Sequence, residues 1–270
     1  MAVVASGTEL QMTPPSDLQL YDRIGPGYAQ RRRADPRLAQ SIGAALGDAR
    51  TVLNVGAGAG SYEPVDRWTI AAEPSRTMIH QRPPGSGPVV QARAEALPFA
   101  SRSFDAALAV LAVHHWSDWR LGVSEMLRVS RDRVVLLTWD PDGPGFWLVA
   151  DYFPEVLAAD RARFPRMGEL EEAMGDLEVI PVPIPHDCTD GFMGAFWRRP
   201  SAYLDPDVRG AMSSLATGAS PAALARLADD LATGTWHQRY ASYLDATELD
   251  LGYRLVIGKA LPLGARAGEG

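Results

Sequence analysis

The stretch that indicates the fold runs Val52-Leu53-Asn54-Val55-Gly56-Ala57-Gly58-Ala59-Gly60. Its first half is a short apolar pattern typical of a buried strand, and its second half is a glycine-rich turn. Glycine lets the backbone turn sharply and lets a ligand approach without a Cβ in the way. The next predicted strand ends at Glu73, so this carboxylate is expected beside the turn, where it can accept both hydroxyls of a ribose. The alternative is a structural turn and a solvated glutamate.

Short apolar segments bounded by turn residues alternate with helical patterns along the first half of the chain, as in βαβ proteins. Five of them are predicted as buried parallel strands: Thr51–Val55, Thr69–Ala72, Val89–Gln91, Phe104–Val113 and Val134–Trp139. A crossover helix is predicted between the last two strands and ends near Ser130. Ser117-Asp118 would cap it, and its apolar face would consist of Leu121, Met126, Leu127 and Val129.

The pattern changes after Trp139. We expect an amphipathic helix at Phe146–Phe164, a short helix at Gly168–Gly175, and a strand at Leu177–Ile184 whose prolines suit a sheet edge. Helices and loops follow, including Ser220–Leu231 with Pro221 in its first turn, and Gly252–Leu261 is the last strand. The sequence thus predicts an α/β fold: a seven-stranded mixed sheet flanked by helices, with helical cap insertions after strands 5 and 6.

Composition excludes several classes of function. The chain has 270 residues and a formal net charge of −7, so it lacks a basic field for nucleic acid. Its longest apolar run, Ala106–Val113, is too short to cross a membrane. Cys188 is the single cysteine, which excludes an intrachain disulfide and makes the cytoplasm the default location. Arginine-rich composition, with Lys259 as the only lysine, suggests a GC-rich bacterial source. Monomer and homodimer both remain open.

The turn differs from a dinucleotide-binding fingerprint. Such a fold would place glycine or alanine at position 61 and a full helix before the acidic residue, whereas this chain has Ser61 and Pro64. A ligand made of a nucleoside and an amino acid therefore fits better than a nicotinamide dinucleotide.

Three further motifs follow the turn: Ala94-Glu95-Ala96-Leu97-Pro98-Phe99, Ser103-Phe104-Asp105-Ala106-Ala107 and Val113-His114-His115-Trp116. In order and spacing they resemble the class I S-adenosylmethionine-dependent methyltransferase family, in particular its small-molecule enzymes of the type 11 kind, over Tyr21 to Trp139. The resemblance implies a Rossmann-like fold, S-adenosylmethionine as methyl donor with S-adenosylhomocysteine as product, and a small-molecule acceptor, in keeping with secondary metabolism.

The resemblance also implies which residues bind the donor. The glycine turn would lie against its amino-acid part, Glu73 would hold the ribose, the loop around Glu95 would meet the adenine, and an upstream Tyr-Asp segment would close over it. The expected donor residues are Tyr21, Tyr28, Arg32, Asn54, Gly56, Ala57, Gly58, Glu73, Pro74, Ser75, Met78, Ala94, Glu95, Ala96 and Leu111.

Three departures from the family pattern affect this site. Asn54 replaces an acidic residue, so its carbonyl oxygen or a water would have to meet the donor's ammonium group. Arg93 stands where an acidic residue often reaches the adenine amino group, which favours backbone contacts. The segment between Gly60 and Glu73 has room only for a helix of a turn or two, which reduces any contribution from a helix terminus.

The expected parts are an arm or disordered segment (1–20), a Rossmann-like donor-binding core (21–145) and a first cap insertion (146–165). A core helix and strand 6 (166–185), a second cap insertion over the acceptor site (186–250), core strand 7 (251–262) and a tail (263–270) follow.

Methyl transfer is an in-line displacement that depends mainly on positioning, to which a general base can add. In an open α/β sheet the reactive crevice lies beyond the carboxyl ends of the strands. His114 and His115 end the fourth strand and Asp140 ends the fifth, so we expect a histidine base, preferably His115, oriented by Asp140. The alternative is that the histidines pack or form a turn. No metal site is predicted, because the five histidines lack a supporting cysteine or HExxH pattern.

A second candidate group is His186-Asp187-Cys188-Thr189-Asp190-Gly191-Phe192, either an acceptor-pocket wall or a loop held by Asx-type bonds. Aromatic residues of the insertions either form a core or line a flat apolar cavity for an aromatic or polyketide-like metabolite. They are Phe146, Trp147, Tyr152, Phe153, Phe196, Trp197, Tyr203, Trp236 and Tyr243. The sequence leaves open whether O, N or C is methylated. It also leaves open a cyclase that uses the donor non-covalently and a non-catalytic metabolite sensor.

Overall fold

The computed structural model describes residues 28–260, and its centre is a seven-stranded sheet of order β3-β2-β1-β4-β5-β9-β6. Strand β9 is antiparallel to β5 and β6, and the remaining neighbours are parallel. The predicted mixed sheet is therefore confirmed. Its strands are β1 (Thr51–Val55), β2 (Trp68–Ala72), β3 (Val89–Val90), β4 (Phe104–Val110), β5 (Ser130–Trp139), β6 (Leu177–Pro181) and β9 (Tyr253–Lys259).

The apolar run of β1 makes it a central strand buried on both faces. Because successive side chains of a strand point to opposite faces, Val52 packs in one cluster with Leu38 of α3 (Pro36–Ala45), and Leu53 packs in the other with Met126 of α5 (Trp119–Val129). The carboxyl end of β1 is thereby fixed between two layers of helices. Helix α5 begins where predicted, since Asp118 accepts a hydrogen bond from the Leu121 backbone N–H at 3.0 Å. Leu121 itself is 46% exposed and lies outside the apolar face predicted for it.

Several predicted elements differ from the structure. The single helix expected over 146–164 is two pieces, a π-helical turn η2 (Leu148–Tyr152) and α6 (Pro154–Arg163). They separate at Phe153 because proline disfavours the helical conformation of the residue before it. The short helix expected after Gly60 does not form, and residues 57–67 are turns. Strand β4 ends at Val110, so the two histidines lie in a 3₁₀ turn, η1 (Val113–His115), rather than on the strand.

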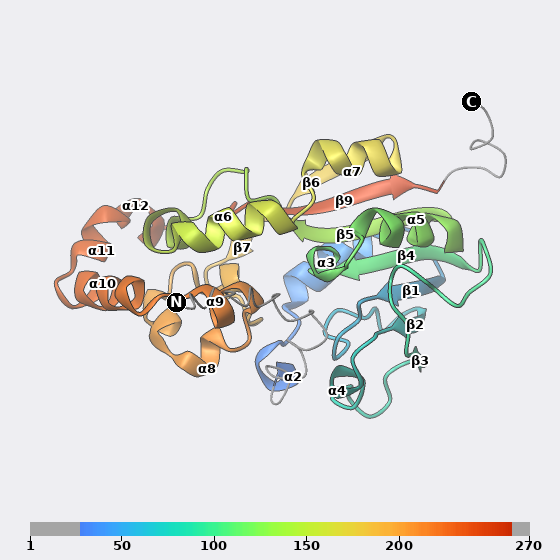
Figure 1. The fold of residues 1–270 in the computed structure, drawn as a ribbon, viewed down its shortest axis with the longest axis horizontal. Coiled ribbons are helices and arrows are strands. Elements are labelled where there is room, and N and C mark those ends of the chain that lie inside the picture. Colours follow the sequence, from blue (N-terminus) through green and yellow to red (C-terminus); the bar gives the residue numbers. More distant parts are fainter. Residues whose placement is uncertain (1–27, 261–270) are drawn as a thin grey trace, which may run out of the picture.

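The remaining elements connect or cover the sheet. The proline-rich strand is at the sheet edge as predicted, and its last residues form a separate pair, β7 with β8. Figure 1 shows α6 and α8 to α12 gathered at the end of the sheet to which β4 and β5 point. These elements are α2 (Tyr28–Arg31), α4 (Arg76–Ile79), α7 (Met167–Met174), β7 (Ile184–Pro185), η3 (Met193–Phe196), η4 (Pro200–Leu204), α8 (Pro206–Arg209), α9 (Ser213–Gly218), α10 (Pro221–Ala232), α11 (Thr235–Arg239), α12 (Ala241–Leu244) and β8 (Glu248–Leu249).

We call the segments 146–163 and 193–244 the cap. The cap packs on one face of the sheet in a single hydrophobic cluster with Val52 and Leu38. Within it the ring of Trp147 lies 5.2 Å from that of Trp236 and 5.8 Å from that of Tyr203. The Trp147 indole N–H donates to the Trp197 carbonyl at 3.0 Å. Aromatic packing of this kind lets several very short helices hold together. Within 28–260, no helix has both the length and the apolar character needed to span a membrane.

Candidate functional site

A cavity of about 350 Å³ lies at the carboxyl ends of β1, β2 and β4. All of the predicted donor residues line it except Ala96, which closes a turn with Arg93, and Tyr21, which lies outside the described residues. The cavity therefore gathers residues from three separate strand ends. Further lining residues, not among the predicted donor contacts, are Ala59, Ser61, Tyr62, Arg93, Val110, Ala112, His115, Trp116 and Ser117.

The glycine turn follows β1 and is tied to the end of β2. Gly56 and Gly58 have φ of 67° and 54°, in the left-handed region that favours glycine. The Gly56 N–H donates to the Ala72 carbonyl at 2.9 Å. A Cβ on Gly56 would stand 2.7 Å from the Cβ of Ala112, so no other residue fits without a shift. The turn thus leaves bare backbone facing the cavity.

Glu73 ends the second strand with a buried carboxylate on the same cavity. Its Oε2 accepts the Gly58 N–H and its Oε1 accepts the Ser75 N–H, both at 2.8 Å. Burial raises the pKa of Glu73, and these two bonds and the charge of Arg82 oppose that rise. Each oxygen keeps further lone-pair capacity, so the fixed carboxylate can still accept two hydroxyls from a ligand.

Asn54 lines the cavity and carries an acceptor without a partner among the described residues. Its Nδ2 donates to Glu63 Oε1 at 3.3 Å, and Glu63 is held in turn by Arg82 through two bonds of 2.7 Å. This fixes the amide so that Oδ1, which is buried, has no hydrogen-bond partner among the described residues. Unpaired buried acceptors are costly. A cationic ammonium group of a ligand would satisfy it, in the way that the sequence leads us to expect.

The side chain of Glu95 holds the loop at 93–96 in place by bonding to Ser117. Glu95 accepts the backbone N–H and the hydroxyl of Ser117 at 2.8 and 2.7 Å. Burial tends to raise the pKa of Glu95, but the Ser117 bonds and the charge of Arg93 outweigh it and hold that pKa below its usual value. Gly122 of α5 leaves room for the Trp116 ring, which a Cβ there would meet at 2.4 Å. A flat ligand ring would thus meet backbone and the indole.

A second, smaller cavity of about 60 Å³ lies beside the first and shares Tyr28, Arg32, Leu111 and His115 with it. Leu111 has φ of 50°, a strained conformation for a branched residue and one that recurs at functional sites. None of the nine aromatic residues expected to line an acceptor cavity lines either of these two, because they pack in or against the hydrophobic cluster that joins the cap to the sheet. The other residues of the second cavity are His114, Trp139, Asp160, Phe164, Phe192, Met193, Ala211, Met212, Ser213, Ser214 and Tyr253.

The two predicted histidines have different surroundings. His115 Nδ1 lies 3.3 Å from the Nη2 of Arg163. Since arginine only donates, this nitrogen must accept, and a neutral His115 carries its proton on Nε2. His114 stacks on Phe164 with ring centroids 3.9 Å apart. Burial, followed by His115 and Arg163, lowers the pKa of His114 well below its usual value. His114 is thus neutral near neutral pH, and His115 can take a proton on Nδ1 only if Arg163 moves away.

The structure places Asp140 and His186 outside both cavities, in contrast to the prediction. The chain after β5 turns toward β9, so the Asp140 N–H donates to the Gly252 carbonyl and its carboxylate accepts the Asp142 N–H. His186 Nδ1 lies 3.1 Å from the Thr247 carbonyl oxygen at the β7–β8 pair. Asp140 therefore serves a turn, and His186 joins the segments that follow β7 and precede β8.

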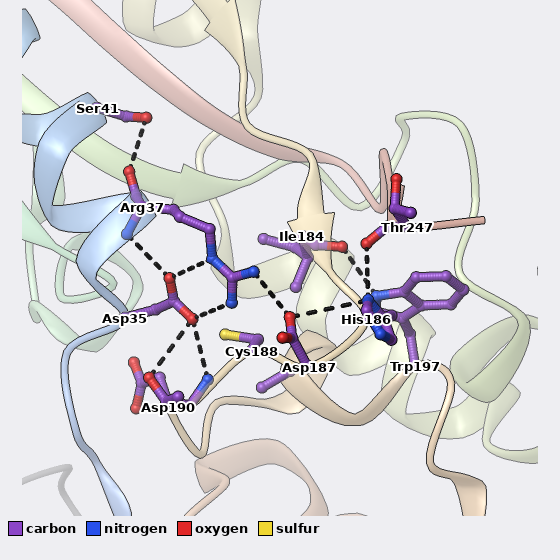
Figure 2. A network of polar contacts seen from close by, with 12 residues as sticks. Asp35, Arg37, Ser41, Ile184, His186, Asp187, Cys188, Asp190, Trp197 and Thr247 are labelled. Atoms are coloured by element: carbon purple, nitrogen blue, oxygen red, sulfur yellow. Dashed lines mark hydrogen bonds and ion pairs between the residues drawn. The ribbon is translucent and has the colours of Figure 1, made fainter.

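The loop 186–192 is held by ion pairs, as Figure 2 shows. Asp35 pairs with Arg37 at 2.7 Å and accepts the Thr189 N–H at 3.0 Å, and Arg37 also pairs with Asp187. Burial raises the pKa of the Cys188 thiol to about 12, so it is not a ready nucleophile. This part of the loop is structural.

Asp190, in the same loop, connects it to the first cavity. Its buried carboxylate accepts from Arg32 Nε at 2.8 Å and from the Tyr62 hydroxyl at 2.9 Å. Arg32 in turn donates to the Tyr28 hydroxyl at 2.7 Å. Phe192, two residues later, lines the second cavity. The loop therefore joins the wall of one cavity to the wall of the other.

One protein family model and several solved structures are similar to this chain. The chain matches the family model described as a methyltransferase domain over residues 53–138. A structure from Anabaena variabilis ATCC 29413, described as a methyltransferase from an antibiotic biosynthesis pathway, is 33% identical, with a TM-score of 0.77. The alignment covers 85% of this chain and 99% of that one. The YcgJ protein of Bacillus subtilis is 18% identical, with 90% and 99% covered and a TM-score of 0.48. A search of curated protein sequences finds no match.

Proposed function

This chain belongs to the class I S-adenosylmethionine-dependent methyltransferase family, and on that premise we propose that it methylates a small organic molecule. When bound, S-adenosylmethionine supplies a methyl group on a positively charged sulfur, which leaves as the neutral thioether of S-adenosylhomocysteine. Because such a displacement depends on alignment, the protein's main task is to hold two molecules in register.

The larger cavity fits the donor. Glu73 would accept the ribose hydroxyls, and the backbone of the glycine turn would lie along the amino-acid part. The unpartnered Oδ1 of Asn54 would accept from the ammonium group. Ala94 and Trp116 would lie against the adenine, and Arg32 with Tyr28 would cover the site. Each role rests on a polar atom or a space that faces the cavity.

The observation that carries the proposal is the second cavity, which shares Tyr28, Arg32, Leu111 and His115 with the first. An acceptor there would lie next to the donor. The walls include the rings of Trp139, Phe164, Phe192 and Tyr253, which favour an aromatic or apolar group. Its small volume admits the reactive end of such a molecule, at O, N or C. The pathway named for the Anabaena variabilis relative supports a secondary metabolite as acceptor.

Product analysis tests this function. Purified protein would be incubated with S-adenosylmethionine and a panel of small aromatic metabolites, and the products would be identified by mass spectrometry. We expect S-adenosylhomocysteine and a methylated compound in equal amounts, both absent with Glu73→Ala. Donor binding together with a rearranged but unmethylated product would contradict methyl transfer and favour a cyclase of the same fold.

A further inference from the structure

The second cavity contains a carboxylate to which neither the sequence prediction nor the proposed donor contacts give a role. Asp160 of α6 is 1% exposed, and its Oδ1 accepts from the Ser214 hydroxyl at 2.8 Å. Its Oδ2 is buried and has no hydrogen-bond partner among the described residues. The nearest cation is Arg163, whose Nη1 lies 3.9 Å from Oδ1. A buried carboxylate oxygen without a partner is costly.

A structural role accounts for only one of the two carboxylate oxygens of Asp160. The bond from Ser214 joins α6 to α9, but it uses one oxygen, and a serine or asparagine at position 160 would form it without burying a charge. His114 Nδ1, on the same cavity, is also buried and unpartnered among the described residues. Two polar atoms without partners on one small cavity indicate a ligand with a polar group.

We propose that Asp160 Oδ2 binds a hydroxyl group of the methyl acceptor, and that this hydroxyl is the group that becomes methylated. The inference rests on the proposed function. A hydroxyl can donate to Asp160 and bond to His114 at the same time. Arg163, 3.9 Å from Oδ1, already supplies a positive charge beside Asp160, which disfavours an ammonium group there, and an acceptor carboxylate would leave Oδ2 without a donor.

The same contact supplies a proton acceptor. In the transfer the hydroxyl oxygen forms a bond to the methyl carbon, and the carbon–sulfur bond breaks with its electron pair going to sulfur. The hydroxyl proton passes to Asp160 Oδ2. Burial raises the pKa of Asp160 against the opposing effects of Ser214 and Arg163, which makes it a better base than an exposed carboxylate. His115 is less suited, because its Nδ1 accepts from Arg163.

Binding of two matched probes tests the inference. Phenol and toluene have rings of the same size, but only phenol can donate to Asp160. Their affinities for protein saturated with S-adenosylhomocysteine would be measured by ligand-observed NMR. We expect the wild type to bind phenol about tenfold more tightly than toluene, as for one hydrogen bond to a charged group. Asp160→Asn should abolish the preference, whereas Glu155→Gln, at an exposed position of the same helix, should keep it.

Binding of S-adenosylhomocysteine would be measured first for every variant, so that loss of the fold or failure of the proposed function is seen separately. Ser214→Ala removes the structural bond but not the carboxylate, and it should keep the phenol preference. If the loaded wild type fails to prefer phenol, or if a folded Asp160→Asn variant keeps the preference, the inference is wrong. The comparison in the wild type decides the matter even where Asp160→Asn does not fold.

Discussion

At the scale of single residues, the donor site depends on polar atoms fixed by their neighbours. Asn54 is held by Glu63 so that its amide N–H group is used and its carbonyl oxygen is not. Glu73 is held by two backbone N–H groups so that its carboxylate cannot rotate away. Preorganised groups of this kind bind more tightly than mobile ones, because less freedom is lost on binding.

Asn54→Leu should weaken binding of S-adenosylhomocysteine about tenfold, because a hydrogen bond from a charged ammonium group is lost. The matched ligand is 5′-methylthioadenosine, which lacks the amino-acid part and should bind equally to both proteins. Calorimetric titration measures both. An equal loss for the two ligands would mean that Asn54 supports the cavity as a whole and does not contact the ammonium group.

The raised pKa of Glu73 predicts how donor binding depends on pH. Burial favours the protonated acid in the folded protein, so its folded pKa lies above the usual 4.5. Glu73 therefore ionises less readily in the folded protein than in the unfolded chain, so its contribution to the free energy of unfolding falls as pH rises from that usual value through the folded pKa. Two ribose hydroxyls need an ionised acceptor, so affinity for S-adenosylhomocysteine should fall as pH is lowered through the folded pKa. Glu73→Gln should bind weakly and without this dependence, as titrations at several pH values would reveal.

Sequence reasoning found those residues lining the larger cavity that follow strands in short motifs. The glycine turn, Glu73 and the loop at 94–95 are each local, and the parallel sheet brings strand ends together. It missed Tyr62 and Asp160, and it named Asp190 only within a segment read as either an acceptor-pocket wall or a loop. Tyr62 and Asp190 bond across 128 positions of sequence, and Asp160 meets Ser214 across 54. No local pattern marks such pairs, since only the tertiary fold brings them together.

At the scale of elements, the strand patterns were informative, and in the cap the helix predicted at Ser220–Leu231 is confirmed as α10, whereas the other cap helices were not predicted individually. Strands of the central sheet are short, apolar and buried on both sides, so their sequences are distinctive. The helix predicted over 146–164 ignored the effect of Pro154, and helices such as α8 and α12 have only four residues each. Helices this short have little stability of their own and depend on tertiary contacts, such as that of Tyr243 in α12 with Trp197.

The conformation of the glycine turn predicts how a substitution of Gly56 affects stability. Gly56→Ala should destabilise the protein by about 2 kcal/mol, because alanine is strained at φ of 67° and its Cβ would stand 2.7 Å from that of Ala112. It should also weaken donor binding. Gly43→Ala is the matched control, because nothing lies within 4 Å of its Cβ and it is inside α3. Denaturant unfolding should show the control stabilised by roughly 0.5–1 kcal/mol. Equal behaviour of the two variants would contradict the steric argument.

At the scale of the whole molecule, Asp190 joins three distant segments. Arg32 precedes α3, Tyr62 follows the glycine turn, and Asp190 belongs to the loop that leads from β7 to the cap. Asp190, with Arg32 and Tyr62, therefore connects the segment before α3, the wall of the larger cavity and the loop that leads to the cap. It thereby fixes walls of the two cavities relative to each other.

Asp190→Asn should destabilise the protein by about 3 kcal/mol, because it leaves the buried guanidinium of Arg32 without its counter-charge. Affinity for S-adenosylhomocysteine should fall as well, since Arg32 and Tyr62 line that cavity. Asp187→Asn, which alters the exposed pair with Arg37, should change little. Chemical denaturation and titration of both variants provide the check. Similar effects of the two would show that the loop is held mainly by its apolar residues.

The most direct test of the central claim is calorimetric titration of the purified protein with S-adenosylmethionine and S-adenosylhomocysteine, with Glu73→Ala as control. The account predicts one site per chain for each ligand, with affinity greatly reduced by the substitution. Absence of binding to both ligands, or binding that Glu73→Ala leaves unchanged, would contradict the donor site described above.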